Sequence, residues 1–265
     1  MSLTHIYVKD FPTWQEYYWK YQFLLAQEYY IPLLKNWNVQ VKGKKVLDIG
    51  CGNGGFTAAF GDSGADCVGV EIRDFNWKES NNVTYKVQDI LSENAVNNLG
   101  SDYDIIILRD VIEHILLDHK FDFLSSLKSF ANPDTVFLIT FPPFYSPFGL
   151  HQQTFLKSFL KKLPFLGMIP NIFLLPILHL LHESEEALNN IIEIKKCKMT
   201  NMNFIKLMKS LSFKINQKKF FTFRPSHEIR LGWRTRISPI GNIPLLNEIF
   251  VLGTVYLASL QDKTD

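Results

Sequence analysis

A glycine-rich loop near position 50 constrains this 265-residue chain more than any other feature. The apolar run 45–49 carries an acid at Asp48 and is followed by Gly50, Gly52, Gly54 and Gly55. The pattern predicts a strand, a tight turn and a helix N-terminus, which together let a nucleotide-like ligand approach bare backbone. A Cβ atom would block that approach, and such turns often need positive φ. A second apolar run ends at Glu71, where an acid can accept hydrogen bonds from both hydroxyls of an adenosine ribose.

Two kinds of ligand fit this loop. The spacing Gly50-x-Gly52-x-x-Gly55 also matches the dinucleotide-binding fingerprint. Asp48 argues against a dinucleotide, because its charge would repel a pyrophosphate but suits the ammonium and sulfonium of S-adenosylmethionine (SAM). Asp89 closes a third apolar run, where it can accept a hydrogen bond from an adenine amino group, and 104–115 predict a fourth strand entering a polar loop. SAM is therefore favoured, and a nicotinamide-dependent oxidoreductase is the less favoured alternative.

The motifs VLDIGCGNGG, GVE, QDI and DIIILRDVIEH, in that order, resemble those of class I SAM-dependent methyltransferases. The most similar group is that of small-molecule enzymes, including the ubiquinone-biosynthesis O-methyltransferases. The resemblance covers 44–142 well, and 200–221 and 248–261 more weakly. It implies an α/β fold with a Rossmann-like, mostly parallel sheet of seven strands in the order 3-2-1-4-5-7-6. Helices would sandwich this sheet, its last strand would be antiparallel, and a helical cap would be inserted.

The resemblance also implies which residues bind SAM, with S-adenosyl-L-homocysteine (SAH) as the product. The glycine loop would hold the methionine end, Glu71 the ribose, and Asp89 the adenine amino group. Two isoleucines would flank the adenine ring. The full predicted cofactor set is Asp48, Gly50, Cys51, Gly52, Gly54, Glu71, Ile72, Gln88, Asp89, Ile90, Arg109 and Asp110.

The length suits one domain with insertions better than two full domains. We expect N-terminal lid helices in 1–40, a cofactor-binding core in 41–142, a variable substrate cap in 143–199, and a C-terminal helix with antiparallel strands in 200–265. The first five strands read as near-continuous apolar runs, as in a sheet covered on both faces. Ligands of such βαβ units bind at the carboxyl ends of the strands. The expected strands are 45–49, 67–71, 83–87, 104–108, 135–141, 213–221 and 248–260.

Two histidines are candidate catalytic residues. The proline-rich loop 140–153 leaves a central strand and should line the substrate pocket. His151 in this loop is the best general-base candidate, because a base with a pKa near neutrality can take a proton as the methyl group arrives. The alternative is that His151 only anchors the loop. His114 is a second candidate, although a lone histidine at a helix start more often packs. No cluster has metal-ligand spacing, so we expect metal-independent transfer.

The acceptor is expected to be a small molecule that is lipid-like or anionic. Aromatic residues at helical spacing over 13–37 predict one or two helices. The resemblance implies that such a helix covers the cofactor mouth, and the alternative is that it simply packs on the edge of the sheet. The basic segment 224–236 is expected to be a loop, which can grip a carboxylate or phosphate, or else form a solvated surface or an oligomer contact. Lid candidates are Tyr17, Tyr18, Trp19, Tyr21 and Gln22. Candidate acceptor contacts are Tyr18, Tyr21, Tyr145, Arg230 and Arg234.

Partners and location follow from composition. A net charge of +2 without an added RNA-binding segment argues against nucleic acid, although a protein or RNA methyltransferase or a non-catalytic SAM-binding protein stays an alternative. The uncharged stretch 163–181 nearly reaches membrane-spanning length, but its prolines would break a spanning helix. It predicts a peripheral lipid contact or a substrate cover, with plain insertion into the hydrophobic core or the interface of a homodimer as the alternatives. Three cysteines without metal spacing and no visible secretory signal predict a cytoplasmic protein.

Overall fold

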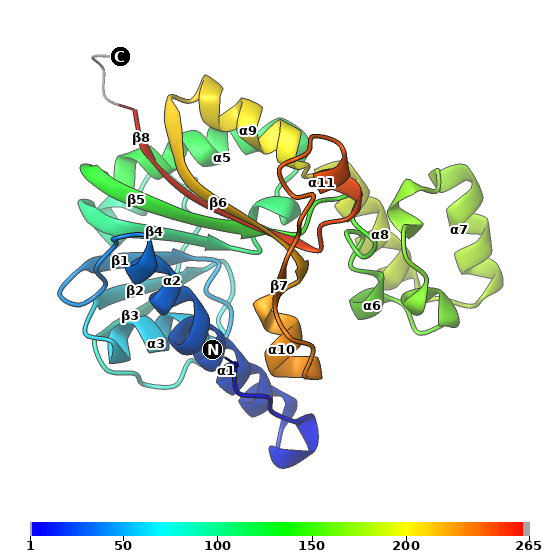
Figure 1. Ribbon diagram of the computed structural model, residues 1–265, viewed down its shortest axis with the longest axis horizontal. Helices are drawn as coiled ribbons and strands as arrows, with labels where there is room; N and C mark the ends of the chain where they lie inside the picture. Colours follow the sequence, from blue (N-terminus) through cyan, green and yellow to red (C-terminus); the bar gives the residue numbers. More distant parts are fainter. Residues whose placement is uncertain (1, 262–265) are drawn as a thin grey trace.

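An eight-stranded mixed sheet runs through the computed structural model, which describes residues 2–261 (Figure 1). The strand order is β3-β2-β1-β4-β5-β8-β6-β7. The first five strands in that order pair in parallel, and β8 lies antiparallel between β5 and β6. The strands are β1 (Lys45–Ile49), β2 (Asp66–Glu71), β3 (Val83–Val87), β4 (Tyr103–Arg109), β5 (Ala131–Phe141), β6 (Phe213–Phe223), β7 (Arg236–Ile237) and β8 (Gly253–Leu260).

The predicted α/β class and strand order are confirmed, with one correction to the number of strands. The sheet has eight strands instead of seven, because the two-residue β7 pairs with the end of β6. A second correction concerns the last long strand. It begins at Gly253 and not at 248, because residues 246–249 form the short helix α11 (Leu246–Ile249).

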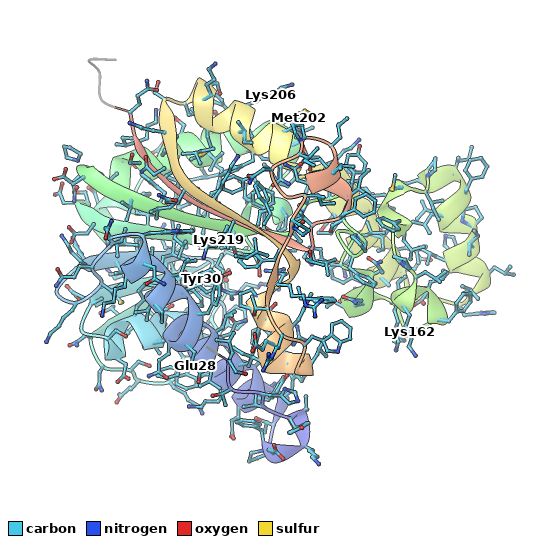
Figure 2. The ribbon with its side chains drawn as sticks, in the orientation of Figure 1. Glu28, Tyr30, Lys162, Met202, Lys206 and Lys219 are labelled. Atoms are coloured by element: carbon cyan, nitrogen blue, oxygen red, sulfur yellow. The ribbon has the colours of Figure 1, made fainter. Side chains whose placement is uncertain are left out.

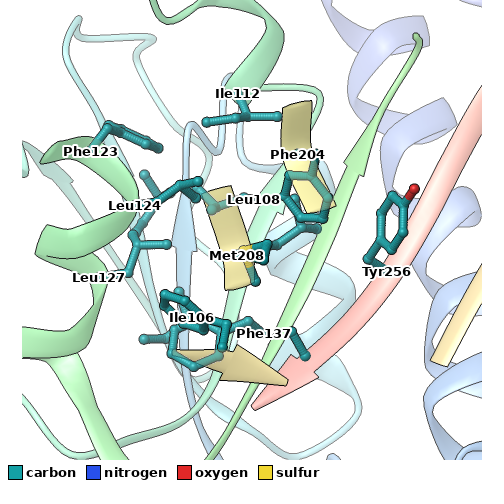
Figure 3. Close-up of a cluster of buried hydrophobic side chains, with 14 of the residues drawn as sticks. Ile106, Leu108, Ile112, Phe123, Leu124, Leu127, Phe137, Phe204, Met208 and Tyr256 are labelled. Atoms are coloured by element: carbon teal, nitrogen blue, oxygen red, sulfur yellow. The ribbon is translucent and has the colours of Figure 1, made fainter. Parts of the chain in front are cut away.

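Alternating side chains along the central strands build two apolar cores, one on each face of the sheet. On one face, Ile106 and Leu108 of β4 pack with residues of α5 (Lys120–Ser126) and α9 (Asn201–Ser210), as Figure 3 shows. On the other face, Ile105 and Ile107 pack with residues of α3 (Gly55–Asp62) and of the N-terminal helices. The remaining short helix of the core, α4 (Ala95–Leu99), belongs to the first face. Packing on both faces thereby holds the strands in place, and with them the loops at their carboxyl ends.

The N-terminal helical region is nearly continuous, as predicted for 13–37. It consists of α1 (Trp14–Leu25), a π-helical segment (Ala26–Tyr30) and α2 (Ile31–Asn36). Thr13 caps it by accepting a hydrogen bond from the Glu16 amide at 3.2 Å. This region packs on α3 so closely that a Cβ atom on Gly55 would lie 2.2 Å from the Trp19 carbonyl oxygen. The glycine at that position therefore sets how closely α1 approaches the loop after β1.

The basic segment 224–236 was predicted to be a loop, and this prediction was wrong. It contains α10 (Pro225–Leu231), with proline at the first helical turn and Gly232 in left-handed conformation after the last. Proline at a helix start and glycine just past its end are ordinary boundary signals. The signal was therefore present in Arg224-Pro-Ser-His-Glu-Ile-Arg-Leu-Gly232.

The insert after β5 forms a lobe that projects from the sheet (Figure 1). Its helices are α6 (Gln152–Phe155), α7 (Asn171–Leu180) and α8 (Glu185–Cys197). They share an apolar cluster of their own, which includes Leu174, Leu178 and Ile191. Within residues 2–261 no helix has the length and apolarity needed to cross a membrane. The uncharged stretch 163–181 instead folds into two short helical pieces, a 3₁₀ turn (Leu166–Met168) and α7.

Candidate active site

Two cavities lie where the carboxyl ends of the parallel strands meet. The first cavity, of about 510 Å³, collects residues that follow β1, β2, β3 and β4. The second cavity, of about 290 Å³, lies between α1, the end of β4, the start of the lobe and α10. Asp110 and His114 line both cavities. The two cavities therefore share a wall directly after β4, in the position where parallel α/β sheets bind their ligands.

The first cavity brings together seven of the twelve predicted cofactor residues. The Glu71 carboxylate accepts hydrogen bonds from the amides of Gly52 at 3.2 Å and Ile72 at 2.9 Å, which hold it at the end of β2. Asp89 accepts one from the Leu91 amide at 2.9 Å. Both carboxylates are thus oriented by backbone. The predicted residues that line this cavity are Gly50, Glu71, Ile72, Gln88, Asp89, Ile90 and Asp110.

Gly50 has a conformation that only glycine adopts easily. Its φ is +75°, and a Cβ atom there would lie 2.4 Å from Cγ2 of Val111. The rest of the loop is held by two aromatic residues that the sequence analysis did not identify. The Trp77 indole donates to the Gly52 carbonyl at 2.7 Å, and the Tyr85 hydroxyl donates to the Gly54 carbonyl at 2.8 Å.

Other residues of the glycine loop lie behind the cavity wall. Asp48 is buried and accepts a hydrogen bond from the Thr57 hydroxyl at 2.6 Å. Burial raises the pKa of its carboxyl to about 6. Burial also raises the pKa of the Cys51 thiol, which therefore stays protonated. Asp48, Cys51, Gly52 and Gly54 line neither cavity, so the structure gives them the role of shaping the loop.

A cluster of charges forms one side of the second cavity. Arg224 Nη2 donates to both carboxylate oxygens of Asp110, at 2.6 and 2.7 Å. Nη1 of Arg109 lies 3.3 Å from Oδ2 of the same carboxylate. Burial alone would raise the pKa of the Asp110 carboxyl, but the two guanidinium groups outweigh it and hold that pKa below its usual value. The Arg109 guanidinium also lies 4.8 Å from the centre of the Phe56 ring. Of the lid candidates, Tyr18, Tyr21 and Gln22 line this cavity.

The two candidate catalytic histidines lie next to each other. Their ring centres are 5.1 Å apart, and His151 precedes α6 with a left-handed backbone. Nε2 of His151 is buried and has no hydrogen-bond partner among residues 2–261. Burial, reinforced by His114, lowers the pKa of His151 to about 4, so the ring is neutral near pH 7. Burial also lowers the pKa of His114.

Glu113, which is itself buried, lies beside the two histidines. Neither of its carboxylate oxygens has a hydrogen-bond partner in the described part of the chain, and burial raises its pKa well above the usual value. Donor atoms of Glu113, His114 and His151 all lie within 4.8 Å of one another. The spacing of residues does not predict this cluster of three, because His151 is 37 positions from His114 in the sequence. Nearby, the buried Lys120 donates to the carbonyls of Ile112 and Ile115 and so fixes the turn that carries this group.

Two predicted acceptor contacts lie away from both cavities. Tyr145 packs against Phe144 inside the lobe, with the Lys198 ammonium 5.3 Å from its ring centre. Arg234 follows α10 and lines neither cavity. The structure therefore does not support contact with the acceptor for these two. Arg230 does line the second cavity, and its guanidinium lies 5.3 Å from the Tyr21 ring centre.

Known proteins resemble this chain in sequence and in fold. A family model described as a methyltransferase domain matches residues 18–160. The ubiquinone biosynthesis O-methyltransferase of Leptothrix cholodnii is 30% identical over 95 residues, which are 32% of this chain and 40% of that protein. The chain thus matches well under half of the length of such curated relatives.

Solved structures show the same fold at low identity. The plantazolicin methyltransferase BpumL in complex with SAH is 14% identical, with a TM-score of 0.54 over 93% of this chain and 89% of that one. The magnesium protoporphyrin IX methyltransferase of Synechocystis PCC 6803 with bound SAH is 16% identical, with a TM-score of 0.52 over 91% and 85%. The family match and the motifs around both cavities show that this chain belongs to the methyltransferase domain family, as a class I SAM-dependent methyltransferase.

Proposed function

We propose that this enzyme transfers a methyl group from SAM to an oxygen or nitrogen atom of a small, negatively charged acceptor. The observation that carries the proposal is the wall that the two cavities share at Asp110 and His114. A donor held in the first cavity and an acceptor held in the second would meet at this wall. Holding two reactants in contact is itself a large part of catalysis for a transfer of this kind.

The first cavity fits the nucleoside part of SAM. The oriented carboxylate of Glu71 can accept hydrogen bonds from ribose hydroxyls, and Asp89 can accept one from the adenine amino group. Ile72 and Ile90 offer apolar surface for the ring between them. When bound, SAM supplies a methyl group already activated by the positive charge on sulfur. The SAH complexes of the two structural neighbours support the same choice of cofactor.

The charge of the second cavity supports an anionic acceptor. Three guanidinium groups, those of Arg109, Arg224 and Arg230, line it against the single carboxylate of Asp110, which leaves a net charge of +2. The histidines add no charge near neutral pH, because burial lowers the pKa of each of the three that line the cavity. Such a site favours a carboxylate, phosphate or phenolate and repels an ammonium or guanidinium acceptor. The relatives named for O-methyl transfer support an oxygen as the methylated atom.

His151 is placed to accept a proton from the acceptor. Its Nε2 is buried and has no hydrogen-bond partner among the described residues, and the residue lines the second cavity. The neutral ring is the form that can accept a proton, but a pKa of about 4 makes it a weak base. This suits an acceptor whose reacting O–H or N–H group is itself acidic and whose negative charge is carried by a separate carboxylate or phosphate group. The role is therefore to hold and receive a proton at Nε2 and not to ionise an unactivated alcohol.

Calorimetric titration tests the proposal in two stages. SAM and SAH should bind the purified chain with micromolar affinity, and NADH should not bind. Acceptors are then compared in pairs that differ only in charge, such as an aromatic carboxylate and its amide. The anionic member of each pair should be methylated faster or bind more tightly. Binding of NADH without SAM would refute the cofactor, and preference for neutral or cationic acceptors would refute the acceptor class.

His151→Gln should lower kcat by about 10- to 100-fold, since only part of the usual gain from a general base is available to so weak a base. SAM affinity should stay within about twofold, because His151 does not line the first cavity. Single-turnover kinetics with the best acceptor measures the effect. Thr154→Val is the matched control: Thr154 lines the second cavity but carries no titratable group. Equal turnover in His151→Gln and the parent chain would remove the assigned role.

A further inference from the structure

The outer surface of the lobe carries apolar side chains that the lobe's own core does not use. Leu174 and Leu178 of α7 are buried against α8. On the opposite side, Ile172 is 76% exposed, Phe173 63% and Leu180 76%. A water-facing helix surface is ordinarily polar, so an apolar face of this kind marks an interaction site.

Neighbouring turns extend this face. Phe159 and Met168 are also exposed, and they belong to the 3₁₀ turns (Phe159–Lys162 and Leu166–Met168) that precede α7. Figure 1 shows α7 at the margin of the molecule, on the side of the lobe away from the sheet. We call the surface formed by Phe159, Met168, Ile172, Phe173, Ile177 and Leu180 the lobe face. Its position leaves it accessible to a large, flat partner.

The part of the lobe from residue 142 to 182 carries only positive formal charge, and the acids of the lobe, including the exposed Glu185 and Glu186, follow it in the sequence. Between Phe141 and Glu183 the sequence contains no aspartate or glutamate, and its lysines are Lys157, Lys161 and Lys162. Glu183, the first acid after this stretch, is buried and accepts hydrogen bonds from the amides of residues 157 and 158. Figure 2 shows Lys162 at the margin of the lobe. Apolar side chains beside lysines without acids are typical of segments that lie in the interface of an anionic membrane.

We propose that the lobe face docks onto a lipid bilayer with anionic headgroups. The apolar side chains enter the boundary between headgroups and acyl chains, and Lys161 and Lys162 contact the phosphates. The attachment is peripheral, because α7 has ten residues and a proline at position 176. Docking does not depend on the proposed function. One consequence does rest on it: the same insert contributes Phe148 and His151 to the second cavity, so an acceptor carried in the membrane would enter near the lobe.

Flotation with vesicles tests the docking. The full chain is mixed with vesicles of phosphatidylcholine alone or with added phosphatidylglycerol, at low and at high salt. Binding should require phosphatidylglycerol and weaken with salt. The triple variant Ile172→Ser, Phe173→Ser and Leu180→Ser should reduce the vesicle-bound fraction more than about tenfold. The double variant Lys161→Glu and Lys162→Glu should remove the dependence on phosphatidylglycerol.

Matched controls carry the same substitutions elsewhere on the surface. Ile237→Ser on β7 removes an isoleucine that is 59% exposed, and Lys206→Glu with Lys209→Glu reverses two exposed lysines of α9. These variants should bind vesicles like the parent chain. SAM affinity, measured on every variant, reports folding and the cofactor site separately from docking. The proposal is overturned if the parent chain binds no vesicle, or if the triple variant binds as well as the parent. It is also overturned if the triple substitution abolishes a concentration-dependent dimer and leaves vesicle binding unchanged.

Discussion

Gly50→Ala should weaken SAM binding by about 30- to 1,000-fold, because the new methyl group meets Val111 and the backbone is left-handed. The left-handed conformation costs an alanine about 1–2 kcal/mol, and relief of the 2.4 Å contact costs about 1–2 kcal/mol more. In the free protein the loop can relax away from the ligand-ready shape. SAM must then restore that shape, so about 2–4 kcal/mol is subtracted from its binding free energy. Isothermal titration calorimetry measures the difference directly.

Two other glycines distinguish the cost of the left-handed backbone from the cost of the contact with Val111. Gly52 lies in the same loop with φ +54°, and Gly43 lies outside the site with φ +74°; a Cβ atom on either meets nothing within 4 Å. Gly52→Ala should weaken SAM binding by no more than about 30-fold, since only the backbone cost of about 1–2 kcal/mol applies. Gly43→Ala should lower stability and leave SAM affinity unchanged. If Gly50→Ala bound SAM within about threefold of the parent, the loop would not be the cofactor site.

Asp48→Asn should raise the free energy of unfolding near pH 7, by about 1–3 kcal/mol. Burial raises the pKa of Asp48 in the folded chain to about 6, above its ordinary value of 3.8. The folded state therefore binds more protons than the unfolded state between about pH 4 and pH 6, and stability falls as the pH rises through that window. Asparagine has no charge to lose or gain. The advantage of the variant should appear across this window and stay constant above it.

Urea denaturation at a series of pH values measures this effect. Asp104→Asn is the matched control with the opposite sign. Burial alone would raise the pKa of the Asp104 carboxyl, but the Lys44 ammonium at 2.9 Å and the Lys45 amide at 2.8 Å outweigh it and lower that pKa. Asp104→Asn should therefore destabilise the chain at neutral pH. A pH-independent difference between Asp48→Asn and the parent would show that the Asp48 carboxylate is not disfavoured in the folded state.

The parts of this protein that sequence predicts well are those determined by neighbours along the chain. Strands β1, β2 and β4 are short, mainly apolar runs with polar residues at their ends, and the glycine loop predicts the start of α3. Glu71 and Asp89 were predicted for the cofactor site because each directly follows or ends such a run, and both line the first cavity. Period and composition are sufficient for inferences of this kind.

The parts that sequence did not predict depend on partners far apart in the chain. Arg224 binds Asp110 across 114 positions, and only the arrangement of β4, β6 and α10 shows that they meet. The proximity of His114 and His151 depends in the same way on the fold of the lobe. Asp48 was expected to face the ligand, but its carboxylate instead accepts a hydrogen bond from the hydroxyl of Thr57 on α3. Side-chain direction at such points is decided by tertiary packing and not by local pattern.

The position of β8 has a consequence for how the chain is made. Both strands that flank it, β5 and β6, precede it in the sequence and therefore leave the ribosome first. Until β8 follows, each of them presents an open row of backbone donors and acceptors, and an open edge of this kind invites pairing with another chain. Because β8 lies between β5 and β6 but is synthesised after both, these two strands cannot be joined within the sheet until β8 has been made. During translation the edges of β5 and β6 are therefore the places where this chain is most open to pairing with another chain.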